Sequence, residues 1–215
     1  LGSSRFYRYI RGFGFGAPTE VGLPGETAGL IRPPDEWTPV DLAAAGFGQS
    51  LSVSATQLAV ALGAVANDGL LMRPILIKEV LDGQGRVVRR NNSRVVRRVI
   101  SATTAERLKG LLADVLKPGG TGARAALAQY QAAGKTGTAQ VFTVKQDEEY
   151  DEETVEKRKR DHALFIAFAP LEDPEIVVAI IEENGEHGSA VAPIAKKIMD
   201  TYLLKDDAEL TADAK

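Results

Sequence analysis

The stretch ALFIAFAPLEDPEIVVAIIEE, residues 163–183, decides the fold class. It contains two near-continuous apolar runs, residues 163–170 and 175–183, and such runs are typical of strands that are covered on both faces. The link LEDPE is too short for the crossover that a parallel pair needs, so the two strands are predicted to be antiparallel. The centre of the domain is therefore expected to be an antiparallel sheet.

The segments on either side of this pair extend the sheet and cover it. GKTGTAQVF, residues 134–142, predicts a third strand over Lys135–Phe142. After NGEHG, a closing helix is expected to pack one apolar side on the sheet. The residues on that side are Val191, Ile194, Ala195, Ile198 and Tyr202. The domain is predicted to span residues 1–204, and the polar tail, 205–215, is expected to be disordered.

Two helix starts are indicated upstream by capping boxes. Ser54 with Gln57 predicts a helix that ends at the Asn67-Asp68-Gly69 run, and Thr103 with Glu106 predicts another that stops at Lys117-Pro118-Gly119. Together with the sheet, these helices indicate the α+β class, an antiparallel sheet flanked by helices.

The irregular segments carry their own predictions. Residues 3–11 are basic and aromatic and are expected to form a surface helix, while residues 72–88 predict a hairpin with Asp82 and Gly83 in its turn. Trp37 lies in a proline-rich loop, and we expect it to anchor that loop to the body of the domain. The alternative is that Trp37 lines a groove.

Composition excludes several classes of function. The chain has 215 residues and a net charge of −3, which offers no electrostatic footprint for nucleic acid. No apolar run approaches the roughly 18 to 20 residues that span a bilayer. There is no cysteine, and His162 and His187 have no metal-ligand spacing, so no metal or other cofactor is expected. His162 is more simply a packed or hydrogen-bonded residue.

GFGFGA, residues 12–17, has the glycine spacing of the dinucleotide-binding fingerprint but not its structural context. That fingerprint needs a strand before it and a helix after it, so that a pyrophosphate can lie at the helix amino end. Here a basic aromatic segment precedes the glycines and a Pro-Thr-Glu loop follows them. The segment is therefore interpreted as a structural turn.

The run Lys135-Thr136-Gly137-Thr138 can be an ordinary entry into a strand or one wall of a site. Side chains alternate along a strand, so Thr136 and Thr138 point to the same face and can contact one carboxylate. Lys135 supplies positive charge, and Gly137, which lacks a side chain, opens the strand to the backbone of a ligand. This combination is suited to hold a peptide carboxyl terminus beside the strand.

The charged stretch 143–161 separates the first two predicted strands. Its pairs Glu153–Lys157 and Glu156–Arg160 have the i,i+4 spacing that supports a helix. We interpret it as a solvated helical excursion, with a docking surface for a partner as the alternative.

With these elements in place, the chain resembles the penicillin-binding transpeptidases, and among them the class B, elongation-type enzymes known as penicillin-binding protein 2. The fold expected from the resemblance is the β-lactamase/transpeptidase-like type, of which this chain is the C-terminal part. The segments that carry it are FGFGAPTEVGLPGE, GFGQSLSVSATQLAVALGAVANDG, GGTGARAA, GKTGTAQV, RDHALFIAFAP and EENGEHG.

The resemblance implies a peptidoglycan D,D-transpeptidase that works through a serine acyl-enzyme. Lys135 would tune the site and assist proton movement, and the Thr138 N–H would donate to the oxyanion. Thr136, Gly137 and Thr138 would bind the substrate or β-lactam, with the two threonines at its carboxylate. Expected partners are peptidoglycan stem peptides, β-lactams and membrane proteins of the elongation machinery. The expected location is the periplasmic side of the inner membrane, with an anchor upstream.

The chain departs from the family pattern at the nucleophile. None of its eight serines has a lysine three residues later or an asparagine two residues later, so the Ser-x-x-Lys and Ser-x-Asn motifs are absent. We interpret the chain as a fragment that is inactive alone; the alternatives are a natural pseudoenzyme and a non-catalytic β-lactam-sensing receptor domain.

Overall fold

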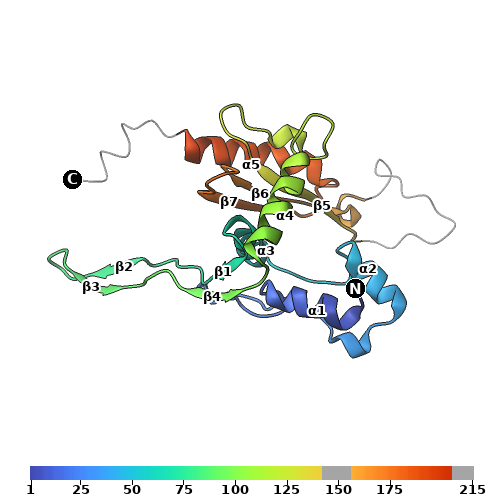
Figure 1. Cartoon of the computed structure of the whole chain (residues 1–215), viewed down its shortest axis with the longest axis horizontal. Coiled ribbons are helices and arrows are strands. Elements are labelled where there is room, and N and C mark those ends of the chain that lie inside the picture. Colours follow the sequence, from blue (N-terminus) through green and yellow to red (C-terminus); the bar gives the residue numbers. More distant parts are fainter. Residues whose placement is uncertain (142–155, 205–215) are drawn as a thin grey trace. The chain divides into compact units, whose positions relative to one another are not determined.

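The structure is a computed structural model that describes residues 1–141 and 156–204, with the Lys157 side chain left out. The chain forms two compact units, Leu1–Glu106 and Arg107–Lys215, which we describe separately (Figure 1). The predicted single domain over 1–204 stays a prediction. The predicted helical excursion lies mostly outside the described residues, and the predicted tail lies wholly outside them.

The first unit combines helices with two short antiparallel strand pairs. Its helices are α1 (Ser3–Gly12), η1 (Pro34–Glu36), α2 (Pro39–Gly46) and α3 (Ala55–Ala66), and α4 (Ala102–Asp114) begins at its end. Its strands are β1 (Leu70–Met72), β2 (Glu79–Leu81), β3 (Val87–Arg90) and β4 (Val95–Arg98). β1 pairs with β4, and β2 pairs with β3. Residues 70–98 therefore form one long two-stranded ribbon whose strands pair in two separate places.

The capping box predicted at Ser54 is confirmed, and it does more than start α3. The Gln57 N–H donates to Ser54 Oγ at 3.1 Å, and the Ser54 N–H donates to Gln57 Oε1 at 2.9 Å. The buried Gln57 amide also donates to the carbonyls of Ala17 and Ala28, at 2.9 Å each. One side chain therefore caps α3 and fixes the glycine-rich loop to it.

The second predicted box, Thr103 with Glu106, is wrong. α4 begins at Ala102, and Ser101 accepts a hydrogen bond from the Thr104 N–H at 3.1 Å. Ser101 already stands at the N-cap position, so its hydroxyl satisfies a first-turn N–H and Thr103 lies inside the helix.

The predicted hairpin and the predicted glycine turn are both present. β2 and β3 are joined through a turn in which the Asp82 N–H donates to the Arg86 carbonyl at 2.9 Å. The glycine that adopts the left-handed conformation there is Gly85, with φ of 79°. GFGFGA begins at the last residue of α1 and has positive φ at Gly14 and Gly16, which agrees with a structural turn.

Trp37 anchors its loop as predicted. Its indole N–H donates to the Arg32 carbonyl at 3.1 Å. Its ring packs edge-on against the rings of Phe6 and Tyr7 in α1, with centroids 6.1 and 6.2 Å away. These contacts join the loop before α2 to the first helix.

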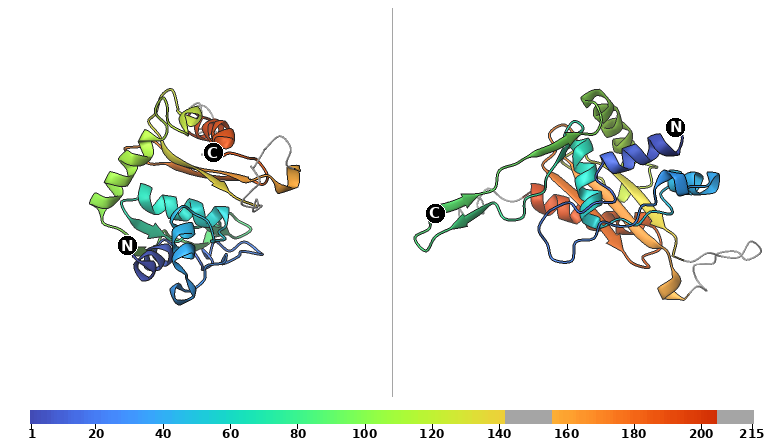
Figure 2. Two further views of the ribbon diagram at one scale, coloured as in Figure 1. Left: turned by 90° about the vertical axis from the view of Figure 1, so that its right-hand side faces the viewer. Right: turned by 90° about the horizontal axis from the view of Figure 1, so that it is seen from below.

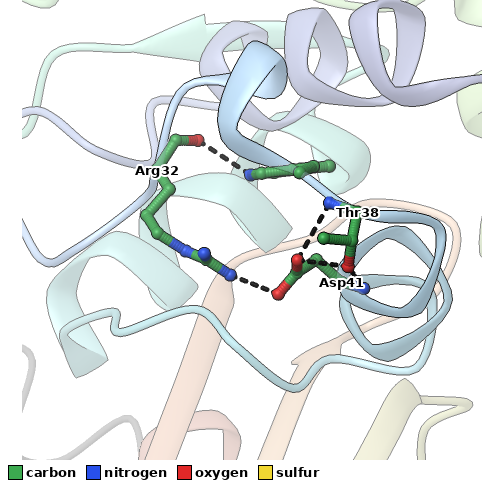
Figure 3. Close-up of polar contacts among 4 residues, drawn as sticks. Arg32, Thr38 and Asp41 are labelled. Atoms are coloured by element: carbon green, nitrogen blue, oxygen red, sulfur yellow. Dashed lines mark hydrogen bonds and ion pairs between the residues drawn. The ribbon is translucent and has the colours of Figure 1, made fainter.

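A polar cluster next to this anchor starts α2 (Figure 3). Asp41 accepts hydrogen bonds from the Thr38 hydroxyl at 2.6 Å and from the Thr38 N–H at 2.9 Å, and it is ion-paired with Arg32. The Thr38 hydroxyl, followed by the Thr38 N–H and Arg32, lowers the pKa of Asp41 to about 2 from its ordinary value of 3.8. The charged form of Asp41 is therefore the form that the fold stabilises.

We expect this cluster to make stability pH-dependent in acid. The folded pKa of Asp41 is lower than its ordinary value of 3.8, so its contribution is complete above that pH and is lost as the pH falls towards 2. Urea unfolding of the wild type and Asp41→Asn between pH 2 and pH 5 measures it. The stability difference should be largest at pH 5 and should shrink towards pH 2. A difference that stays constant over this range would contradict the assignment.

The second unit is a three-stranded antiparallel sheet with a long helix on one face (Figure 2). Its strands, in sheet order, are β5 (Ala133–Ala139), β6 (His162–Ala169) and β7 (Ile176–Glu182). Its other elements are the greater part of α4, η2 (Ala123–Ala125), η3 (Lys157–Lys159) and α5 (Gly188–Leu203). The predicted antiparallel pairing of the two apolar runs is confirmed, as is the α+β class. Phe165 of β6 and Met199 of α5 are fully buried in its core.

The predicted packing side of the closing helix is partly wrong. Val191 and Ala195 are buried, but Ile194, Ile198 and Tyr202 are 47%, 42% and 47% exposed. The buried side consists of small residues and one methionine: Gly188, Val191, Ala192, Ala195 and Met199. Because β6 presents alanines around Phe165, a small-residue side lets the helix approach the sheet more closely than an isoleucine side would.

Candidate active site

The motif Lys135-Thr136-Gly137-Thr138 lies in β5, at one edge of the sheet. Thr136 pairs across the ladder with Phe165, and Thr138 pairs with Ala163. Opposed residues of an antiparallel pair share a face, so both threonines lie on the face that carries Phe165, where α5 packs. The predicted common face of the two threonines is thus present, and Lys135 belongs to the opposite face.

The outer edge of β5 is open in the part of the chain that the structure describes. There β5 pairs only with β6, so alternate backbone groups of the motif point away from the sheet. Such an edge can pair with an extended peptide. Lys135 and Thr138 are exposed, and Thr136 is half-buried, so a ligand in solution can reach all three.

Lys135 folds back along its own strand. Its ammonium group donates to the carbonyl oxygen of Thr136 at 2.7 Å. Although its Cβ points to the face opposite the threonines, this bond brings the charge to the backbone beside Thr136. The ammonium thus lies at the Thr136 backbone carbonyl, and a position next to the threonine hydroxyls stays a prediction.

Thr121 is a site residue that sequence reasoning missed. Its hydroxyl is 2.9 Å from the hydroxyl of Thr136. It sits between two glycines that cannot carry a side chain without movement: a Cβ at Gly120 would lie 2.2 Å from the Val115 carbonyl oxygen, and one at Gly122 would lie 3.0 Å from the Phe165 ring. The loop that holds Thr121 is therefore packed closely against the core.

Gly188 brings the start of α5 onto the motif. A Cβ at Gly188 would lie 2.6 Å from the oxygen and 2.7 Å from the nitrogen of Gly137, and 2.3 Å from the Leu164 carbonyl oxygen. Only glycine allows this approach. Gly137 itself faces Leu164, whose Cβ would be 3.3 Å from an added Cβ. The first turn of α5 thus lies on the strand that carries the motif.

The turn before α5 is held by the first residue of β6 and the two residues before it. The Asn184 N–H donates to His162 Nδ1 at 2.9 Å, and the Asn184 side chain donates to the Arg160 carbonyl at 2.8 Å. The Glu186 N–H donates to the Asp161 carbonyl at 2.9 Å, and Glu186 is ion-paired with Arg160. The hydrogen-bonded role predicted for His162 is confirmed, and the turn NGEHG is fixed at the end of the sheet.

Two negative findings apply to residues 1–141 and 156–204. No group of three or more histidine, aspartate or glutamate side chains in this part of the chain is arranged to hold a metal ion. None of the helices there is both long enough and apolar enough to cross a membrane.

The chain matches a family model described as the penicillin binding protein transpeptidase domain over residues 1–200. It is 34% identical to penicillin-binding protein PbpB of Mycolicibacterium smegmatis, a match that covers 99% of this chain and 34% of that protein. It is also 34% identical to peptidoglycan D,D-transpeptidase MrdA of Acinetobacter baumannii, over 95% of this chain and 32% of that protein. The chain thus spans about a third of these relatives.

A solved structure shares the fold. The crystal structure of penicillin binding protein 3 from Mycobacterium tuberculosis in its apo form matches with a TM-score of 0.82 and 32% identity, over 96% of this chain and 47% of that one. The same protein complexed with ampicillin matches with a TM-score of 0.82 and 31% identity, over the same shares. The transpeptidase-like fold expected from the motifs is confirmed by this match.

Proposed function

This chain belongs to the penicillin-binding protein transpeptidase family, and from that membership we propose that it forms the carboxylate-binding side of a peptidoglycan D,D-transpeptidase active site. The observation that carries the proposal is the pair of same-face threonines, Thr136 and Thr138, on an open strand edge with Lys135 beside them. Hydroxyl and ammonium donors suit a carboxylate, and an open edge suits an extended peptide.

In the proposed reaction, the stem peptide lies along β5 with its terminal carboxylate at the threonine hydroxyls. A serine oxygen bonds to the carbonyl carbon of the penultimate D-Ala, the peptide C–N bond breaks, and the terminal D-Ala leaves after its nitrogen takes up a proton. The amine of a second stem peptide then attacks the acyl-enzyme ester and releases the serine. We propose that this serine lies outside residues 1–215, since the chain has no Ser-x-x-Lys motif.

The remaining roles in this reaction are assigned to the same strand. The Thr138 N–H is proposed as one donor to the oxyanion that develops on the attacked carbonyl. Gly137 keeps the strand free of a side chain where the ligand backbone approaches. Lys135 is proposed to stabilise negative charge at the carboxylate and to assist proton movement.

Thr121 is proposed to position the Thr136 hydroxyl. When Thr121 donates to Thr136 Oγ1, the Thr136 proton is directed away from Thr121 and can point to a carboxylate. A hydroxyl that accepts one hydrogen bond also donates a stronger one, because hydrogen bonds in a chain polarise each other.

We further propose that the intact protein is of the elongation type, acts in the periplasm and is anchored in the inner membrane, with membrane proteins of the elongation machinery as partners. The resemblance of segment 160–170 and the similarity to a MrdA protein support the elongation type. β-Lactams are proposed as ligands because a family member with the same fold binds ampicillin and aztreonam.

The function is tested by acylation of the full-length protein that carries this chain, with benzylpenicillin and its methyl ester. A hydrogen-bonded carboxylate contributes about 1.5–3 kcal/mol, so the free acid should acylate at least about tenfold faster than the ester.

Thr121→Val should slow acylation by the free acid about fivefold and leave acylation by the ester unchanged, since it removes one neutral hydrogen bond. Thr121→Ser, which keeps the hydroxyl, is the matched control.

Each possible result identifies the statement that fails. If the wild type is not acylated by either compound, the transpeptidase proposal is wrong. If the free acid and the ester react equally, the carboxylate role of the strand is wrong. If Thr121→Val reacts like the wild type, only the positioning role of Thr121 is wrong.

A further inference from the structure

The long ribbon of the first unit opens between its two paired parts (Figure 1). One backbone bond closes each end of the opening: the Arg73 N–H donates to the Arg94 carbonyl, and the Asn91 N–H donates to the Lys78 carbonyl, at 2.9 Å each. Between them, residues 74–77 and 92–93 are fully described and make no backbone hydrogen bond with each other. Pro74 has no N–H, and the Ile77 carbonyl accepts a hydrogen bond from the Asn91 side-chain amide at 2.6 Å. The other N–H and C=O groups of residues 74–77 make no hydrogen bond with the described residues and are open to another extended chain.

A cleft of about 420 Å³ lies at this opening, and a second of about 300 Å³ adjoins it. The two clefts share Glu20, Arg73 and Arg94 in their walls, so they lie next to each other, and together we call them the arginine cleft. Its inner part is lined by apolar side chains: Phe13, Val60, Leu71, Met72 and Val96. The arginine cleft is thus apolar in its inner part.

The walls of the arginine cleft are strongly basic. They carry five arginines, Arg73, Arg89, Arg90, Arg94 and Arg97, against the single carboxylate of Glu20. Over residues 73–98 there are eight cationic and two acidic side chains, a net charge of +6, while the whole chain has a net charge of −3. This part of the surface therefore attracts anionic ligands, although the molecule as a whole has a net negative charge.

Two of these arginines, Arg89 and Arg94, have no anionic partner among the described residues. Arg73 is ion-paired with Glu20 at 3.4 Å, and Arg90 with Glu79 at 2.7 Å. By contrast, the guanidinium groups of Arg89 and Arg94 make no hydrogen bond or ion pair with the described part of the chain. They are available to carboxylates of a ligand.

Apolar side chains accompany the arginines at the opening. Leu76 and Ile77 are 59% and 54% exposed, and Ile75 beside them is exposed too. Arginines alone would suit any polyanion. Exposed branched side chains next to unpaired backbone groups favour a peptide, because a polysaccharide or a phosphate polymer has neither strand-forming amides nor apolar side chains to match them.

We propose that the arginine cleft binds an extended acidic segment of a partner protein, in which carboxylates alternate with apolar side chains. The segment adds as a strand at residues 74–77, its carboxylates pair with Arg89 and Arg94, and an apolar side chain enters the inner pocket. This interaction is separate from the transpeptidase proposal, because all of its residues lie in the first unit.

The probe is a blocked eight-residue peptide of alternating glutamate and valine, titrated into the full-length protein and followed by fluorescence anisotropy. We expect binding that weakens as salt rises, because the Debye length falls from about 30 Å at 0.01 M to about 10 Å at 0.1 M. Arg89→Gln/Arg94→Gln should weaken it at least about tenfold, as two charge-assisted contacts are lost. The control, Arg5→Gln/Arg8→Gln, changes the same charge on exposed arginines of α1 and should bind like the wild type.

Two further probes separate the alternatives. A lysine–valine peptide of the same length should not bind, and vesicles of phosphatidylglycerol should not displace the glutamate–valine peptide. The proposal is overturned if that peptide does not bind, if both double variants weaken it equally, or if the vesicles bind in its place.

Discussion

Replacing Lys135 by alanine is expected to slow acylation of the full-length protein by benzylpenicillin by about 100-fold, the size of effect found when one preorganised electrostatic group is removed from an active site. The substitution removes the only cation of the motif and the ammonium that holds the Thr136 carbonyl at 2.7 Å. Both the charge near the ligand carboxylate and the geometry of the strand edge are affected. Stopped-flow measurement of the second-order acylation rate constant gives the result directly.

The same variant should fold normally. Lys135 is exposed and takes no part in the buried cluster around Phe165, so the melting temperature should change by less than about 3 °C. Lys117→Ala is the matched control: it removes an exposed lysine of the same unit whose partner is Asp114, at 2.6 Å. If Lys135→Ala and Lys117→Ala both acylate at the wild-type rate, Lys135 has no role in the site.

The sheet could be predicted because its signals are local. The two apolar runs around LEDPE are each long enough to identify a strand, and the short link between them leaves antiparallel pairing as the only option. β1 and β4 were missed for the opposite reason. Each is three or four residues long, and they pair across a ribbon of more than twenty residues, which no short sequence pattern reveals.

The errors in the helices have definite causes. At α4, two hydroxyl residues, Ser101 and Thr103, both precede apolar positions, and pattern alone does not distinguish the cap from an interior residue. At α5, apolar spacing defines a wide stripe, of which Ile194 and Ile198 form one border. Which part of the stripe is buried depends on the sheet, whose alanine-rich face accepts the small residues of the helix.

Only the part of the site that lies within a single strand, β5, could be predicted from the sequence. Alternation along β5 places Thr136 and Thr138 on one face, and the register confirms it. Thr121 lies fifteen residues before Thr136, and Gly188 lies far beyond Gly137, so their contacts arise from tertiary packing. The segment GGTGARAA, which contains Thr121, carried part of the family resemblance, but nothing in its spacing indicated that the Thr121 hydroxyl would lie against the motif.

The central claim is that this chain provides the carboxylate-binding edge of a transpeptidase site and not its nucleophile. Peptide mapping by mass spectrometry, after benzylpenicillin has reacted with the full-length protein, tests it most directly. We predict one penicilloyl group per molecule, on a serine outside residues 1–215, and no adduct when this chain is treated alone. A penicilloyl group on any of the eight serines of this chain would contradict the account.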